Sequence, residues 1–498
     1  MTIDDPLTPA QLVAVAEGAP VAISAAAAAR IGHARLLVEA ILASGIPAYG
    51  VNTGVGALVN TAVDGPAQRR LSRQLVMSHA CGIGAPLPDT AVRAIIAAQV
   101  NLFAHGRSGV RLAVVEALVA LLNHAVIPVV PTGGSVGYLT HMAHIALVLI
   151  GEGQAWVGGR VLPGAAALAS AGLVPLVLEA KEGLSLLNGT PCATGLGCLG
   201  WDRARRMVEC ADGVAALTLE ALGAQMAAFD GDVLQLRVSA GIAQSGASVR
   251  QWLAGSTHPG AGRLQDALSL RAVPHVHGAV RDAVAHGEAV LADELRSVTD
   301  NPVVGGTFAA PCVQSQAHAV ATGLALAMDS LAIAAAHLGM IAERRLDRLV
   351  NPLVSGLPPF LASDPGVASG FMIAQYSAAA LVGENRRLAA PASLDGGITS
   401  ALQEDYLAHP TAAAIKALAL LDNVAVILGI ELAAAAQAHD LAVPPAARAP
   451  GTAALHRHVR DHIAPYADDV PMADVIAAAA ALIRAGLPPA GPNRATSS

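Results

Sequence analysis

Three stretches of this chain are so long, so apolar and so rich in alanine that they limit the fold to packed helices. They run from Asp329 to Glu343, from Ser369 to Glu384 and from Ala412 to Gln437. Alanine has the highest helix propensity, and strands rarely exceed about ten residues. We therefore predict a mainly α-helical fold. Because apolar helices of this length cannot cover all their sides in one thin bundle, we also expect a homotetramer in which the subunits cover one another.

The composition supports a large core and excludes several classes of partner. Of the 498 residues, 54% are hydrophobic and 13% are charged, which is enough apolar surface for an extensive core. The formal net charge of −7 argues against nucleic acid or an anionic membrane as a partner. Charges interrupt the apolar runs, as Asp329 does inside the stretch from Val320 to Met340, so we expect buried helices rather than membrane spans.

The cysteines and the first residues indicate a reduced compartment. The five cysteines are odd in number and form no Cys-x-x-Cys pair, which fits neither a disulfide framework nor a zinc site. The acidic start Met1–Asp5 lacks the basic and apolar segments of a secretory signal. We expect a cytoplasmic protein.

The pattern along the chain predicts three parts. Residues 1–130 alternate short helices with glycine-containing loops, and one of these loops carries Tyr49. Residues 131–440 form the expected central helical bundle with the active-site motifs. Residues 441–498 are expected to hold C-terminal helices and a frayed tail rich in proline and small polar residues.

A series of short blocks carries the functional signal. The blocks are Tyr49–Gly54, Ser78–Gly82, Gly134–Gly137, Lys181–Thr190, Gln265–Arg271, Thr299–Pro302 and Gln403–Asp405. In this order they resemble the signature blocks of the histidine and aromatic amino acid ammonia-lyases. The resemblance implies an ammonia-lyase or fumarase-like fold with a long central helix bundle, a small-molecule substrate, and active sites shared between the subunits of a homotetramer.

The junction between Gly137 and Tyr138 departs from that family. The run Gly134-Ser135-Val136-Gly137 resembles the segment that leads into an Ala-Ser-Gly triad, which cyclises in the family into the electrophile methylidene-imidazolone. Here Tyr138 follows Gly137 directly. We therefore expect no cofactor. The alternative is a methylidene-imidazolone from an Ala-Ser-Gly triad between Gly137 and Tyr138 that is missing from the recorded sequence.

Three side chains are the candidate catalytic residues. A phenol on a glycine-rich loop, such as Tyr49, can act as a general base where positive charge stabilises its anion, although it could also simply pack the loop. The Arg271 guanidinium can hold both oxygens of a substrate carboxylate, or form a structural ion pair. The resemblance places Glu404 in the pocket, facing the substrate ring, whereas its sequence context would equally suit a helix N-terminus.

Seven further residues are candidates for substrate binding. Amides such as Asn188 and Asn301 can hold an amino group or a carboxylate oxygen, or cap a helix. Tyr138 and Tyr376 offer aromatic faces to a cation. The full set is His79, Tyr138, Asn188, Gln265, Asn301, Tyr376 and Gln403.

We expect no metal site. His141 and His144 lie three residues apart on a predicted helix, but no third ligand clusters with them in the sequence.

The missing triad decides the predicted function. A primary amine is a poor leaving group that the family's electrophile captures, whereas a quaternary nitrogen leaves as a neutral tertiary amine without help. We therefore expect elimination of trimethylamine from a histidine betaine, ergothioneine to thiourocanate, as in the triad-lacking ergothionases. The alternatives are a methylidene-imidazolone-dependent histidine or aromatic amino acid lyase or aminomutase, and a catalytically dead binding relative.

Overall fold

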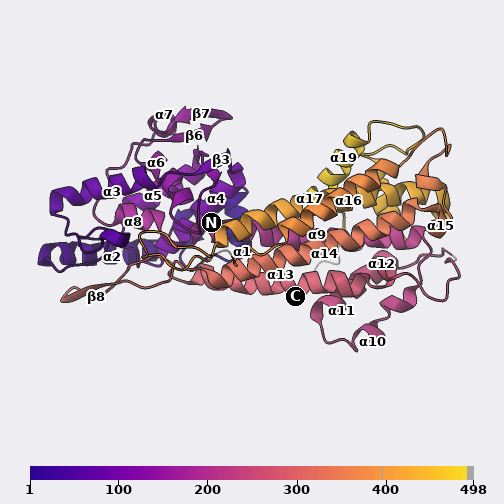
Figure 1. Ribbon diagram of the computed structural model, residues 1–498, viewed down its shortest axis with the longest axis horizontal. Coiled ribbons are helices and arrows are strands. Elements are labelled where there is room, and N and C mark those ends of the chain that lie inside the picture. Colours follow the sequence, from indigo (N-terminus) through magenta and orange to yellow (C-terminus); the bar gives the residue numbers. More distant parts are fainter. Residues whose placement is uncertain (259, 395, 491–498) are drawn as a thin grey trace. The chain divides into compact units, whose positions relative to one another are not determined.

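The computed structural model of the chain describes residues 1–258, 260–394 and 396–490. The final residues of the predicted frayed tail, 491–498, lie outside this range. The chain forms two compact units (Figure 1). Unit 1 comprises Met1–Asp202, Gly287–Asp329 and Pro391–Ile415, and unit 2 comprises Arg203–His286, Ser330–Ala390 and the chain from Lys416 onward.

Four long helices contribute residues to both units. They are α9 (Pro191–Ala221), α13 (Val273–Arg296), α14 (Thr322–Val350) and α17 (Pro410–Ala442). The helices predicted from alanine-rich stretches are confirmed, because α14 and α17 contain two of the stretches and α16 (Met372–Leu388) contains most of the third. Helix α16 begins three residues later than predicted, after Gly370 adopts a left-handed φ of 58°. The mainly helical fold is therefore confirmed.

Unit 1 is a mixed region of helices and short strands. Its helices are α1 (Pro9–Ala16), α2 (Ala25–Ser44), η1 (Gly56–Leu58), α3 (Gly65–His79), α4 (Asp89–Ala104), α5 (Leu112–Asn123), α6 (Thr140–Leu149), α7 (Gly164–Ser170) and α8 (Glu182–Leu187). Its strands are β1 (Thr2–Ile3), β2 (Ala22–Ile23), β3 (Ile83–Pro86), β4 (Ile127–Pro128), β5 (Pro131–Gly133), β6 (Gln154–Val157), β7 (Arg160–Pro163), β8 (Val303–Thr307) and β9 (Ala310–Gln314). They pair as β1-β2, β3-β5, β4-β6-β7 and β8-β9; β1-β2 is parallel and the other pairs of these strands are antiparallel.

The regular elements of unit 2 are all helices among its described residues. Besides its parts of the four long helices and α16, it contains η2 (Met226–Phe229), α10 (Gly231–Leu234), α11 (Ala240–Trp252), α12 (Leu268–Arg271), α15 (Pro352–Ser355), η3 (Pro359–Leu361), η4 (Pro445–Ala447), α18 (Pro450–Arg460) and α19 (Met472–Ala485).

Two helices, α14 and α17, are long and apolar enough to cross a membrane by length and composition alone. In each, 61% of the most apolar 18-residue window is buried inside the protein. Mostly buried core helices meet the same two criteria, so length and apolarity are weak evidence for a membrane span here.

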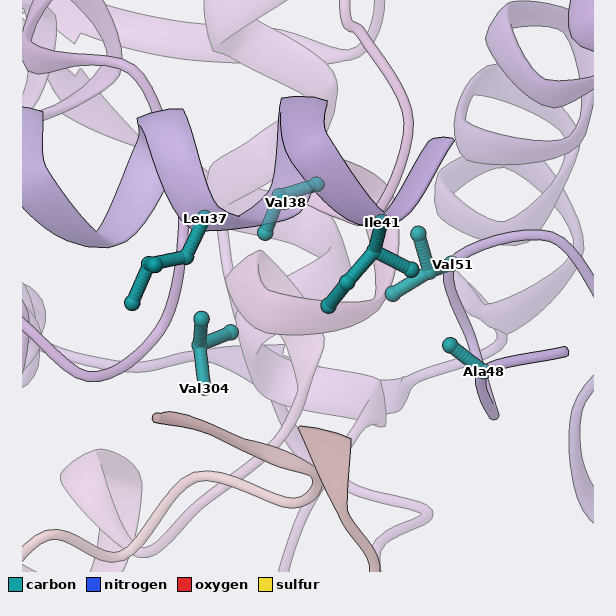
Figure 2. Packing of buried hydrophobic residues seen from close by; sticks show 6 residues of the cluster. All are labelled: Leu37, Val38, Ile41, Ala48, Val51 and Val304. Atoms are coloured by element: carbon teal, nitrogen blue, oxygen red, sulfur yellow. The ribbon is translucent and has the colours of Figure 1, made fainter. Parts of the chain in front are cut away.

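A small apolar cluster anchors the loop that carries Tyr49. Leu37, Val38 and Ile41 on α2 pack with Ala48 and Val51, the residues on either side of the Tyr49-Gly50 pair, as Figure 2 shows; Val304 at the start of β8 completes the cluster. The side chain of Asn52 fixes the same loop, since it accepts from the Ala48 amide at 2.7 Å and donates to the Ile46 carbonyl at 2.8 Å. The residues on either side of Tyr49 are therefore held in place by packing and hydrogen bonds.

The core of unit 2 contains a buried network of charged residues. Arg345 pairs with Glu431 through two hydrogen bonds of 2.6 and 2.8 Å, and Arg281 pairs with Asp212 at 2.5 Å. His277 joins the two pairs, because its Nδ1 donates to Asp212 at 2.7 Å while its Nε2 accepts from Arg345 at 3.4 Å. Only the neutral imidazole satisfies both contacts. Burial, acting first, lowers the pKa of His277 from its usual value of 6.5.

This network predicts a loss of stability in acid. Because the pKa of His277 is lower in the folded than in the unfolded chain, its contribution to stability is complete above 6.5 and is lost as the pH falls below that value. The variant His277→Asn keeps a donor toward Asp212 but cannot take up a proton. Between about pH 7.5 and about pH 5.5, we expect the melting temperature to fall less for this variant than for the wild type. An equal fall in melting temperature for the variant and the wild type would contradict the assignment of the acid sensitivity to His277.

Candidate active site

The candidate site is a cavity of about 800 Å³ lined entirely by residues of unit 1. Its walls come from the Tyr49 loop, the end of α3, the turn before α6, α8 and the residue after it, the segments at 301 and 315–320, and the turn at 399–404. Seven of the ten predicted site residues line it: Tyr49, His79, Tyr138, Asn188, Asn301, Gln403 and Glu404.

Tyr138 and Glu404 meet inside this cavity. The Tyr138 hydroxyl donates to Oε2 of Glu404 at 3.1 Å. Burial raises the pKa of Tyr138 well above 10, and the negative charge of Glu404 and the hydrogen bond to it raise it further. The phenol therefore stays protonated and remains a donor to the carboxylate.

The turn that carries Tyr138 is tightly held. The Ser135 hydroxyl accepts from the Gly137 amide at 3.1 Å and donates to the Tyr138 carbonyl at 3.0 Å. Thr411 at the start of α17 donates to the Gly137 carbonyl at 3.0 Å, and a Cβ on Gly137 would lie only 2.7 Å from Pro410. Gly137, with φ of 141°, lets the chain pass this close to α17.

Glu404 lies at the end of a strained turn. Ser400, Ala401 and Leu402 all adopt left-handed φ angles between 49° and 74°, a conformation that costs roughly 1–2 kcal/mol for each L-residue. The amide and carbonyl of Thr399 pair with those of Glu404, at 2.8 and 3.2 Å, and close the turn. The turn projects the Glu404 side chain into the cavity.

Tyr49 faces the same cavity from the opposite loop. Its phenol oxygen accepts a hydrogen bond from the Gly56 amide at 3.2 Å, which fixes the position of that oxygen. A Cβ on Gly56 would lie 2.8 Å from the Ser400 hydroxyl, so the Tyr49 loop and the Glu404 turn approach closely. Gly50, at φ 66°, allows a similar approach to Leu184, where a Cβ would lie 2.3 Å from the side chain.

His79 ends α3 and is held neutral. Burial, acting first, lowers its pKa from 6.5, against a smaller opposing effect of the Leu75 carbonyl. Nδ1 lies 2.8 Å from that carbonyl and therefore carries the proton. The neutral ring leaves Nε2 as an acceptor.

Asn188 and Asn301 are joined by a hydrogen bond. The Asn188 amide group donates to the Asn301 carbonyl at 2.5 Å, and Asn188 Oδ1 accepts from the Gly189 amide at 2.9 Å. Asn301 Oδ1 accepts from the amide of Gln316 at 2.9 Å. Both residues line the cavity, but some of their side-chain hydrogen bonds are made to neighbouring residues of the cavity wall and not to a ligand.

Sequence reasoning missed the buried pair behind this wall. The ammonium of Lys181 donates to Asp300 at 3.2 Å and to Ser185 at 2.7 Å, and the side chains of Lys181 and Asp300 are fully buried. Asp300 immediately precedes Asn301, and its carbonyl accepts from the Gln316 side chain at 2.8 Å. The signal was present, since Lys181 and Asp300 each stand in a motif block, but the blocks do not reveal that the two pair.

Three predicted site residues belong to unit 2. Arg271 and Gln265 lie together, because in the amide orientation that satisfies both groups Gln265 Oε1 accepts from the Arg271 guanidinium at 3.0 Å. Arg271 also donates to the Asp266 carbonyl at 3.0 Å. Tyr376 is exposed on α16. None of the three lines the cavity of unit 1.

His141 and His144 support the backbone of the site. Nε2 of His141 donates to the Thr132 carbonyl at 2.9 Å, and Nε2 of His144 accepts from the Gly82 amide at 3.0 Å. Among the described residues, no three His, Cys, Asp or Glu side chains are grouped so that they could hold a metal ion.

The charge of the cavity determines what it can bind. Glu404 is the single carboxylate among the lining residues, and no lysine or arginine is among them. With His79 neutral, the cavity wall of one chain is negative overall. It suits a substrate that presents a cationic or hydrogen-donating ring, and it needs a positive group from elsewhere to hold a substrate carboxylate.

Comparison with known proteins gives consistent matches along the whole chain. The sequence profile described as aromatic amino acid lyase matches residues 7–461. Histidine ammonia-lyase of Symbiobacterium thermophilum is 44% identical and covers 96% of both chains. Tyrosine aminomutase from Streptomyces globisporus is 36% identical, with a TM-score of 0.94 over 98% of this chain and 97% of that one. Ergothionase from Treponema denticola is 28% identical, with a TM-score of 0.91 over 97% and 98%.

These comparisons correct the function expected from the sequence. Curated relatives at 41 to 44% identity over nearly the full chain are named histidine ammonia-lyase, whereas the ergothionase is 28% identical. The prediction of trimethylamine elimination from ergothioneine is therefore wrong. That prediction gave a three-residue gap more weight than similarity spread over the whole chain, and the histidine ammonia-lyase alternative fits better.

Proposed function

The chain belongs to the aromatic amino acid lyase family and is a carbon–nitrogen lyase, and from that premise we propose that it eliminates ammonia from histidine. The observation that carries the proposal is the cavity in which Glu404, the single lining carboxylate, faces the Tyr49 loop. A carboxylate held in this way accepts a hydrogen bond from an imidazole N–H and favours a protonated ring. Phenylalanine and tyrosine carry no such ring.

The residues at 137 and 138 do not fit a methylidene-imidazolone. The chain has no Ala-Ser-Gly there, and the Ser135 hydroxyl closes the turn by bonding to both Gly137 and Tyr138. We therefore draw no step through that group and propose that the chain's own side chains carry the elimination.

The proposed reaction is a 1,2-elimination with the amine leaving as neutral ammonia. Glu404 holds the protonated ring, which withdraws electrons from the β-carbon and makes its proton easier to remove. Tyr49, in its phenolate form, takes that β-proton and becomes the neutral phenol, and the electron pair of the broken C–H bond forms the new double bond. The Cα–N bond of the substrate ammonium breaks, and its electron pair leaves with the nitrogen. The product is the conjugated imidazolyl acrylate.

The test uses the purified full-length protein and several substrates in parallel. We expect histidine to yield ammonia and the ultraviolet absorbance of a conjugated product, with phenylalanine and tyrosine turned over far more slowly. An intact mass equal to that of the 498-residue chain would support elimination without the prosthetic group; the added mass of a cyclised triad would contradict it. Inert histidine beside trimethylamine release from its betaine would overturn the proposed substrate.

We further propose that the protein is a homotetramer in which a neighbouring subunit supplies Arg271 to the carboxylate of the substrate. The cavity of unit 1 contains no cation of its own, and Arg271 lies in unit 2. Leu326, Ile333 and Met340 support contact between subunits, since all three are exposed on α14 at seven-residue spacing. A stripe of this kind is typical of a helix that packs against another chain.

Mixing two inactive variants tests this sharing. Tyr49→Phe and Arg271→Ala subunits are expected to be inactive alone. When they are dissociated, mixed and reassembled, about one quarter of the sites should contain both native residues if each site draws them from different subunits. Recovered histidine turnover supports sharing. Mixed assemblies that stay inactive, with tetramers verified by light scattering, would place both residues in one chain.

A further inference from the structure

The hydrogen bond between Tyr138 and Glu404 leaves the two carboxylate oxygens in different situations. Oε2 accepts from the Tyr138 hydroxyl at 3.1 Å. No described side chain bonds to Oε1, and the carboxylate lines the cavity. One oxygen is therefore engaged by the protein, while the other is available to a substrate.

Tyr138 is more rigidly mounted than Glu404. Its carbonyl accepts from the Ser135 hydroxyl and from the Thr140 amide, both at 3.0 Å, and the next amide, that of Leu139, donates to the Leu187 carbonyl at 3.1 Å. Glu404 instead follows a left-handed turn of largely exposed residues. The phenol thus connects the carboxylate of an exposed turn to a fixed wall of the cavity.

We propose that Tyr138 is a positioning and specificity residue, whose hydroxyl fixes Glu404 so that Oε1 alone meets the ring of the substrate. This inference rests on the proposed function and adds a reason why the enzyme prefers a substrate with an imidazole ring to one with a phenyl ring. A carboxylate with one oxygen engaged accepts one well-directed N–H. An imidazole offers that donor, whereas a phenyl ring offers none and would leave the oxygen without a partner, which is how polar sites reject apolar analogues.

The variant Tyr138→Phe removes the hydroxyl and keeps the ring. We expect kcat/KM for histidine to fall about 10- to 100-fold, the size of losing a hydrogen bond to a charged group. The preference for histidine over phenylalanine should narrow, because Glu404 can then rotate. A matched control is Tyr406→Phe, whose hydroxyl lies 3.2 Å from Thr322 outside the cavity; it should retain wild-type kinetics.

Substrate preference separates positioning from a purely structural role. If the Tyr138 hydroxyl only stabilises the fold, the variant should have a lower melting temperature and an unchanged preference for histidine over phenylalanine. If it positions Glu404, the preference should narrow while the melting temperature changes little. An unchanged preference would overturn the inference.

A double-mutant cycle shows whether Tyr138 acts through Glu404. If it does, Tyr138→Phe should cost little or nothing in a Glu404→Gln background. Additive losses would mean that Tyr138 acts independently, which also overturns the inference. Failure of the proposed function is distinguishable from failure of this inference, because the wild-type protein would then release no ammonia from histidine.

Discussion

Replacing Tyr49 by phenylalanine is expected to lower kcat for histidine about 10²- to 10⁴-fold, the usual contribution of a positioned general base. The phenyl ring keeps the volume of the side chain, and Ala48 and Val51 still anchor the loop in the apolar cluster. The melting temperature and KM should therefore change little. Steady-state kinetics with histidine, read from ammonia release, measures the effect.

The companion variant is Glu404→Gln, which keeps the size of the side chain but removes the charge that faces the ring. It should also lower turnover strongly, since an amide holds a protonated ring far less well than a carboxylate does. Near-normal rates in both variants would reject the proposed mechanism, and a loss confined to Glu404→Gln would reassign the base.

Replacing Lys181 by methionine is expected to destabilise the protein by about 3–5 kcal/mol, because it leaves a buried carboxylate without its cation. The carboxylate is Asp300, whose side chain is fully buried and whose Oδ1 has no hydrogen-bond partner within the described chain. Chemical denaturation monitored by circular dichroism gives the loss. Activity should fall as well, because Asp300 precedes Asn301 in the cavity wall.

Two controls make this result specific. Adding Asp300→Asn to the methionine variant removes the uncompensated charge and should recover much of the stability. Lys416→Met changes the other lysine of the chain, which is partly exposed and donates to the Ala390 carbonyl, and should cost little. A Lys181→Met protein as stable as Lys416→Met would show that the pair contributes nothing.

The sequence predicted the long helices because alanine-rich periodicity is a local signal. Helices α14 and α17 contain the segments predicted for them, and α16 differs only where the left-handed Gly370 delays its start. The two compact units were not anticipated, because each is assembled from segments far apart in the chain. The predicted divisions near residues 130 and 440 remain a prediction about organisation along the chain.

The sequence predicted which residues form the site but not which of them contact one another. The motif blocks supplied Tyr49, Asn188, Asn301 and Glu404, and the fold brings these four to one cavity. The contact between Tyr138 and Glu404 joins residues 266 positions apart, and no local pattern encodes such a pairing. Long-range pairings of this kind depend on the packing of the helices that position them.

The burial of Lys181 also makes the chain a simple object for chemical footprinting. Only two lysines are present, and one of them is sealed beside Asp300. In the folded protein, an amine-directed acylating reagent should modify Lys416 and spare Lys181. Labelling of the peptide that contains Lys181 would then report the opening of unit 1 without any introduced probe.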